Sequence, residues 1–132
     1  MISRLKGNID AINLDSLVID VNGVGYLVFG SSRLLSTFVI GETTVIEIET
    51  HVREDHINLY GFVDGMERDW FRLLTTVQGV GAKAALGILG ILAPDDLLQT
   101  IAANDKGAIT RAPGVGPKLA TRILSELKDK VG

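Results

Sequence analysis

A short glycine-rich word occurs twice in the second half of the sequence. Residues 79–85 read Gly-Val-Gly-Ala-Lys-Ala-Ala, and residues 114–120, at an offset of 35, read Gly-Val-Gly-Pro-Lys-Leu-Ala. Each copy follows a short helical pattern and begins another one. Glycines permit a tight turn and place no side chain in front of the backbone amides. The next helix then offers unpaired N–H groups and the positive end of its dipole, which together suit an anion.

We interpret each copy as a helix-hairpin-helix motif that grips one stretch of phosphate backbone. Lys83 and Lys118 hold the same place in the two copies and add a full charge beside the amides. Arg122 lies one turn after Lys118 on the same helix face, and its counterpart in the first copy is Gly87. The second hairpin should therefore supply more of the salt-dependent affinity. The predicted DNA-binding residues are Gly79, Val80, Gly81, Lys83, Gly114, Val115, Gly116, Lys118 and Arg122.

Composition limits the other possibilities. The chain has 132 residues, nearly half of them hydrophobic, which is enough for one ordinary domain or two small ones. It has no cysteine, which excludes a disulfide framework and thiolate chemistry. No signal peptide is recognisable, and the longest apolar run, residues 84–93, is too short to span a bilayer. These features predict a soluble cytoplasmic protein.

The distribution of charge along the chain favours a nucleic-acid partner more than the net charge does. A net charge of −3 weighs against such a partner. However, residues 1–63 carry eight acidic and four basic side chains, whereas the remainder carries eight acidic and nine basic ones. The negative charge therefore belongs to the first half, and the basic residues gather around the two hairpins.

The first half has the pattern of a small β-barrel. Residues 17–21 and 26–29 are β-branched or apolar runs joined by an Asn-Gly turn, and residues 44–52 alternate apolar and polar side chains. Residues 56–60 alternate again, so the two alternating runs predict a hairpin with an acidic tip. Residues 31–38 fit either a helical turn or a loop. An earlier run, in which Ile2, Leu5, Ile9 and Ile12 are mixed with polar residues, is read as the first strand. Five short strands in about sixty residues favour a barrel of the OB type.

The second half has the period of helices. From Met66 onwards Trp70, Leu73, Leu74 and Val77 are predicted to share one face, with Glu67, Arg68 and Arg72 on the other. Later helices are expected over residues 83–92, from Pro94 to Ala103, over residues 106–111 and from Pro117. The predicted fold class is therefore α+β, with a five-stranded barrel over residues 1–63 and a helical domain over residues 64–132.

Motifs spread along the whole chain resemble the RuvA family of bacterial Holliday-junction-binding proteins. They are residues 1–7 (Met-Ile-Ser-Arg-Leu-Lys-Gly), 23–26 (Gly-Val-Gly-Tyr), 52–55 (Val-Arg-Glu-Asp), 59–62 (Leu-Tyr-Gly-Phe), 79–81 (Gly-Val-Gly) and 113–129, which begin Pro-Gly-Val-Gly. The resemblance implies an OB barrel, a domain with two helix-hairpin-helix motifs, and a homotetramer, one or two per junction, that holds a four-way DNA junction as a flat cross. It also implies work with the RuvB ATPase motor and the RuvC resolvase.

The resemblance assigns the family's acidic pin to Glu54 and Asp55. Four copies at the centre of a tetramer would repel approaching phosphates and keep the crossover open, whereas an ordinary solvated hairpin tip is the alternative. Members of the family usually continue into a third, motor-binding domain, which these residues do not include. Junction binding is therefore expected of this chain, and recruitment of the motor is not.

Three other functions fit the sequence less well. A DNA lyase or nuclease needs clustered acids or an activated lysine, and no such cluster occurs; no metal site and no cofactor are expected, and His51 and His56 are taken as surface residues. A single-strand binder needs aromatic side chains in a basic groove, whereas the barrel half is acidic. Neither glycine turn has the Gly-Lys-Ser/Thr ending of a nucleotide-binding P-loop.

Overall fold

The computed structural model describes residues 1–131, so Gly132, the last residue of the predicted second domain, lies outside the described residues. The chain divides into two units, Met1–Arg68 and the residues from Asp69 onwards. Helix α2 (Gly65–Thr75) begins in the first unit and continues into the second.

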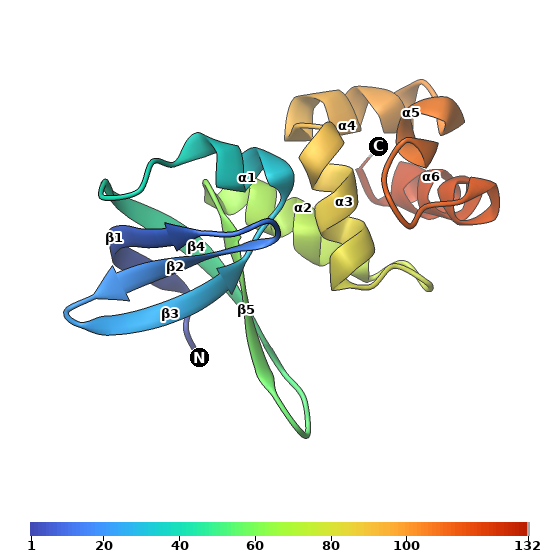
Figure 1. Ribbon diagram of the computed structural model, residues 1–132. Coiled ribbons are helices and arrows are strands. Elements are labelled where there is room, and N and C mark those ends of the chain that lie inside the picture. The colour runs from blue at the N-terminus through green and yellow to red at the C-terminus, as the bar shows by residue number, and fades with distance from the viewer. Residues whose placement is uncertain (132) are drawn as a thin grey trace. The chain divides into compact units, whose positions relative to one another are not determined.

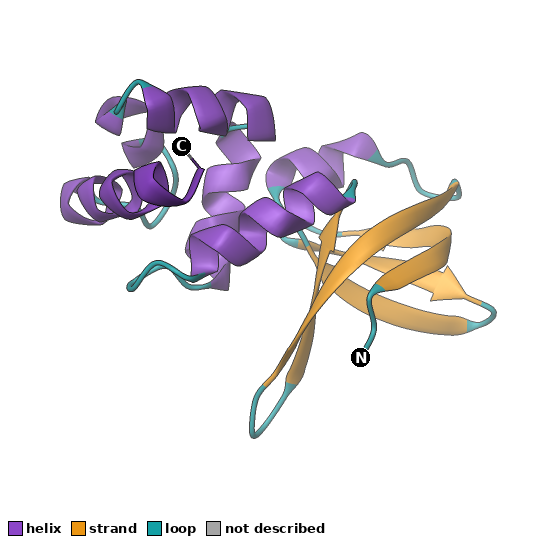
Figure 2. Ribbon diagram, turned by 180° about the vertical axis from the view of Figure 1, so that it is seen from behind, coloured by secondary structure: helices purple, strands orange, loops and turns teal. Residues whose placement is uncertain are grey.

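A closed five-stranded barrel makes up most of the first unit (Figures 1 and 2). The strands are β1 (Arg4–Ile12), β2 (Ser16–Val21), β3 (Val24–Phe29), β4 (Thr43–Val52) and β5 (Ile57–Phe62), with helix α1 (Ser32–Thr37) between β3 and β4. Their order around the barrel is β1-β2-β3-β5-β4. All neighbours are antiparallel except β3 and β5, whose parallel pairing of Val28 with Leu59 and Phe29 with Tyr60 closes the barrel. The predicted five-stranded barrel is confirmed.

Alternation along the strands fills the barrel interior. On β4, Ile46 and Ile48 are buried, whereas Glu47 and Glu49 between and beyond them lie on the other face. The core cluster consists of Leu5, Ile9, Leu17, Ile19, Val28, Leu34, Leu35, Ile46, Ile48 and Leu59. Residues 31–38, for which a loop and a helical turn were both open, form helix α1, because the Ser31 hydroxyl accepts a hydrogen bond from the Leu34 N–H at 3.1 Å and caps it.

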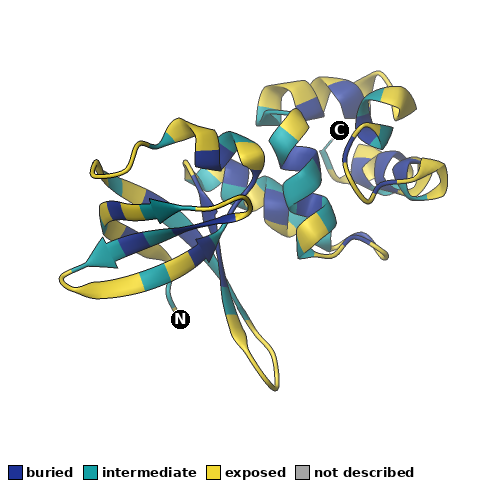
Figure 3. Cartoon of the chain, in the orientation of Figure 1, coloured by how far each residue is buried: buried dark blue, intermediate teal, exposed yellow. Residues whose placement is uncertain are grey.

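The β4–β5 hairpin extends beyond the rest of the barrel as a long ribbon (Figure 1), and its tip is exposed (Figure 3). The ladder pairs Glu47 with Phe62 at one end and Val52 with Ile57 at the other. The four residues between the strands, 53–56, therefore lie far from the barrel core. This is the acidic hairpin that the alternating pattern predicts.

The remaining described residues are helical. After α2 come α3 (Ala82–Ile91), α4 (Pro94–Ala102), α5 (Lys106–Thr110) and α6 (Pro117–Val131). Pro94 and the acids Asp95 and Asp96 open α4, as the sequence predicts. The buried residues of the second unit are Phe71, Leu74, Val77, Val80, Ala85, Ile88, Leu89, Leu97, Thr100, Ile101, Ile109, Ala112, Val115, Ala120, Ile123, Leu124 and Leu127.

The predicted faces of α2 are wrong in one respect. The helical period places Glu67 on the solvent face and Trp70 on the buried one. In the structure Trp70 is only partly buried, whereas Glu67 is 2% exposed. Its Oε2 lies 2.8 Å from Nη2 of Arg33 on α1, so the carboxylate is buried with a cationic partner. Burial raises the pKa of Glu67, and the Arg33 charge opposes that rise. A helical period cannot reveal this pair, because Arg33 lies 34 residues earlier.

Candidate nucleic-acid interface

The two glycine turns have the same backbone geometry. Gly79 has a φ of 94° and Gly114 a φ of 83°, a region that favours glycine. In the first copy the Val80 N–H donates to the Val77 carbonyl at 3.0 Å; in the second the Val115 N–H donates to the Ala112 carbonyl at 3.2 Å. The repeat in sequence is therefore a repeat in structure, which a pair of unrelated tight turns would not produce.

The start of the following helix also repeats. The Gly81 carbonyl accepts from the Ala85 N–H at 3.1 Å, and the Gly116 carbonyl accepts from the Ala120 N–H at 2.9 Å. Gly81 is extended and places no side-chain cap on α3. The first amides of an α-helix have no intrahelical partner, so they are available to an anion at this end. A cap from a side chain would compete for the same amides.

The valines and glycines of each turn have different parts in it. Val80 and Val115 are each 5% exposed, so these side chains anchor the turns in the helical core. Gly79, Gly81, Gly114 and Gly116 are exposed. A Cβ added at Gly81, Gly114 or Gly116 would meet nothing within 4 Å. The glycines therefore leave open space in front of the backbone, as a close approach by a phosphate requires.

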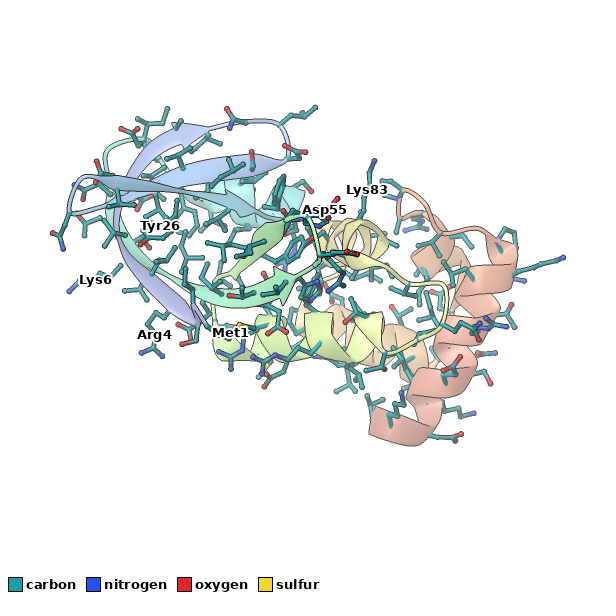
Figure 4. The ribbon with its side chains drawn as sticks, turned by 90° about the horizontal axis from the view of Figure 1, so that it is seen from below. Met1, Arg4, Lys6, Tyr26, Asp55 and Lys83 are labelled. Carbon is teal, nitrogen blue, oxygen red and sulfur yellow. The ribbon has the colours of Figure 1, made fainter. Side chains whose placement is uncertain are left out.

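The predicted cations lie beside these turns. Lys83 is exposed and extends outward from α3 (Figure 4), and Lys118 is exposed on the first turn of α6. Arg122 is also exposed, but its guanidinium has protein partners: Nη1 lies 3.5 Å from the Gln78 carbonyl oxygen, and Nε lies 4.0 Å from Oε2 of Glu126. Its position next to the first turn is a feature that sequence reasoning missed.

Helix α6 holds the first turn at further points. A Cβ on Gly79 would lie 3.2 Å from Cδ1 of Leu119, and Nζ of Lys130 donates to Oγ1 of Thr76 at 2.9 Å. The second copy thus supports the turn of the first. These contacts cannot be predicted from the sequence, because the repeated motif accounts for each turn separately and not for the packing of one copy against the other.

The acidic tip is a tight turn at the end of β4 and β5. The Arg53 N–H donates to the His56 carbonyl oxygen at 2.8 Å, and Glu54 and Asp55 between them are exposed (Asp55 is labelled in Figure 4). Oδ1 of Asp55 lies 2.7 Å from Nδ1 of His56. This hydrogen bond, together with backbone bonding and the imidazole charge, holds the pKa of Asp55 below its usual value. The carboxylate therefore stays ionised around neutral pH.

A second charged cluster braces the first unit away from the tip. Glu47 accepts from Nε of Arg4 at 2.6 Å and from Nη1 of Arg68 at 3.2 Å, which links β4 to β1 and to α2. The hydrogen bond from Arg4 lowers the pKa of Glu47. We assign these residues a structural role, since both carboxylate oxygens of Glu47 accept hydrogen bonds from arginine side chains of the same unit.

The described residues contain neither a metal-binding cluster nor a single helix that could span a membrane. Within residues 1–131 no three His, Cys, Asp or Glu side chains are grouped so that they could hold a metal ion. In the same residues no single helix has the length and apolar character needed to cross a membrane. Helices α3 and α4 together reach that length, but a bend of 95° separates them.

Comparisons with known proteins agree over nearly the whole chain. Residues 1–61 match the family model described as RuvA N terminal domain, and residues 71–129 match SAM-like Helix-hairpin-helix tandem. All 132 residues of the chain align, with 61% identity, to part of the protein named Holliday junction branch migration complex subunit RuvA from Paramagnetospirillum magneticum. The chain belongs to the RuvA family. The helix-hairpin-helix assignment and the α+β class, predicted from the repeated word and the strand pattern, are confirmed with it.

Other RuvA relatives show the same extent of match. The proteins of that name from Methylobacterium radiotolerans and Acidiphilium cryptum are each 56% identical to this chain, over 98% and 99% of it. The chain spans 62% of the length of the Paramagnetospirillum protein, 64% of the Methylobacterium protein and 65% of the Acidiphilium protein.

Proposed function

We propose that this chain binds four-way (Holliday) DNA junctions and holds them open for branch migration in recombination and DNA repair. The observation that carries the proposal is the pair of turns with similar positive φ at Gly79 and Gly114 and the same hydrogen bonds, each leading into a helix whose first turn carries a lysine. Two such grips on one chain suit two neighbouring stretches of phosphate backbone. The names of the relatives point to the same substrate.

In this proposal Gly79, Gly81, Gly114 and Gly116 admit the phosphates, Val80 and Val115 fix the turns, and Lys83, Lys118 and Arg122 supply charge. These groups contact the backbone and not the base edges, so binding is specific for the shape of the DNA and not for its sequence. Arg122 has a second task, since its contact with the Gln78 carbonyl also supports the first turn. The affinity falls with salt as counterions are released from the DNA.

Glu54 and Asp55 form the proposed pin. Both are exposed on a ribbon that extends beyond the barrel, where fixed negative charge repels phosphates that come close. Such a group weakens binding to any DNA that must pass over it, and an open crossover provides the space that a continuous duplex lacks. Residues 1–63 are proposed as the barrel domain that presents the pin, and residues 64–132 as the DNA-gripping domain.

The proposed assembly is a homotetramer, one or two per junction, which brings four pins to the crossover. The chain acts as a non-catalytic subunit in the cytoplasm, and RuvB and RuvC are proposed as partners of the whole protein. Electrophoretic mobility shift with a four-way junction and a linear duplex of equal length, alongside a mass measurement of the free protein, tests the proposal. Preferential binding of the junction by a tetramer is expected. Equal affinity for both DNAs contradicts the proposal.

A further inference from the structure

The tip of the β4–β5 hairpin consists of four consecutive ionisable residues. The last ladder pair is Val52 with Ile57, and the turn between them reads Arg53, Glu54, Asp55, His56. The hydrogen bond from the Arg53 N–H to the His56 carbonyl oxygen, 2.8 Å, closes the turn, so all four residues lie at the end of the hairpin. The net charge of the tip therefore depends on Arg53 and His56 as well as on the two carboxylates.

His56 is bound directly to one of the pin carboxylates. Its Nδ1 lies 2.7 Å from Oδ1 of Asp55, and the two side chains are 48% and 86% exposed. A ring with a proton on Nδ1 donates this hydrogen bond in both its neutral and its charged form. Protonation of the other nitrogen can therefore change the charge of the tip without breaking the contact.

We propose that His56 determines the junction specificity of the pin, by adding a positive charge to the acidic tip when the imidazole is protonated. The inference rests on the proposed function of Glu54 and Asp55. With His56 neutral, Arg53 opposes two carboxylates and the turn carries one net negative charge. With His56 charged, the turn is neutral. In a tetramer the four pins together change from four negative charges to none.

Histidine is the natural titrating group for this range, since an imidazole ordinarily changes its charge between about pH 5 and 8. Carboxylates ordinarily ionise near about pH 4, and the pKa of Asp55 is lowered further by His56. The charged groups at the turn come from the hairpin itself. Strand β3, the other neighbour of β5, carries no charged residue over Val24–Phe29.

His51 provides a natural control on the same hairpin. Its ring lies edge-on to Tyr60 at 5.0 Å between centroids, and Nε2 is 3.9 Å from Glu49. Burial lowers the pKa of His51, with the Arg53 charge acting in the same direction and the Glu49 charge opposing it. This ring therefore gains its charge at lower pH than an exposed histidine and lies outside the tip turn.

The experiment measures junction and duplex affinities by fluorescence anisotropy from about pH 6 to about pH 8 at constant ionic strength. One charge at roughly 8 Å from a phosphate in water changes the DNA affinity by about twofold. One added charge on each of four pins therefore changes it by a factor on the order of tenfold. The wild-type preference for the junction should fall by that factor towards pH 6, mainly through tighter duplex binding. His56→Gln should keep its preference across the range, and His56→Arg should have a low preference even at high pH. His51→Gln should follow the wild type.

The outcomes separate the inference from the function on which it rests. A junction preference that is present in the wild type but constant with pH overturns the role of His56 and leaves the proposed function standing. The same fall with pH in His56→Gln overturns it equally. Absence of any junction preference, at every pH, overturns both. Because residue 56 is exposed in a surface turn, the variants should fold, and an unchanged melting temperature verifies this.

Discussion

Gly87, in the middle of α3, lies against the backbone of Pro113, the residue that precedes the second glycine turn. A Cβ added at Gly87 would be 3.0 Å from the Pro113 carbonyl oxygen and 3.5 Å from its Cδ. Gly87 is the counterpart of Arg122 in the repeat. The first hairpin therefore lacks a second cation for a packing reason: the place that Arg122 occupies in one copy is taken in the other by the approach of the second turn.

Gly87→Val should disturb the second turn from a distance in the sequence. The new side chain must displace Pro113, and overpacking of this kind usually costs about 1 to 3 kcal/mol. We expect a lower urea midpoint and weaker junction binding in the folded protein. Gly107→Val is the matched control, because its Cβ would have only an ordinary contact of 3.6 Å with Asp105. Equal effects of the two substitutions would show that the packing against Pro113 is not special.

Lys118→Ala should reduce the salt dependence of DNA binding. Each phosphate contact contributes about 0.9 to the slope of log K against log salt, so the slope should fall by about that amount and the affinity with it. Titrations at several salt concentrations measure both. Lys128→Ala, which removes an exposed lysine from the other end of α6, should change neither by as much. An unaltered slope in Lys118→Ala would remove this residue from the predicted site.

The parts of the molecule that could be predicted from the sequence are those with local causes. The Gly-Val-Gly motif determines its own turn, because Gly79 and Gly114 adopt a positive φ that favours glycine. The strict alternation in β4 determines which of its residues face the core. These signals were enough for the barrel, the hairpins and the acidic tip, because each arises within a few residues of the chain.

The parts that could not be predicted depend on partners far away in the sequence. Glu67 is buried because Arg33, 34 residues earlier, meets it, and Arg122 reaches the carbonyl of Gln78 across 44 residues. Periodicity assigns a charged side chain to solvent by default. The closing pairing of β3 with β5 is long-range in the same way.

Replacing both pin acids should strengthen binding to plain duplex. Glu54→Ala with Asp55→Ala removes two negative charges from each exposed tip, so duplex affinity should rise by about a hundredfold while the junction preference falls. Competition between the two DNAs in a mobility shift measures the preference. Asp10→Ala with Asp15→Ala removes the same net charge from exposed positions elsewhere on the barrel unit and is the control. If that control lowers the preference equally, net charge and not a pin is responsible.

Removing Arg33 should destabilise the first unit in a pH-dependent manner. Arg33→Ala leaves the buried Glu67 carboxylate without its cation, which should lower the free energy of unfolding by about 2 kcal/mol near neutral pH. Burial raises the pKa of Glu67, so the folded protein favours its protonated form. The stabilisation that this proton contributes is complete below the ordinary pKa of a glutamate and is lost as pH rises through the raised pKa. The deficit should therefore shrink in acid, and adding Glu67→Gln should recover part of it.

Urea unfolding at several pH values measures these effects, with Arg4→Ala, which loses an exposed guanidinium, as the control. A deficit that is constant with pH would mean that the lost ion pair is not its cause.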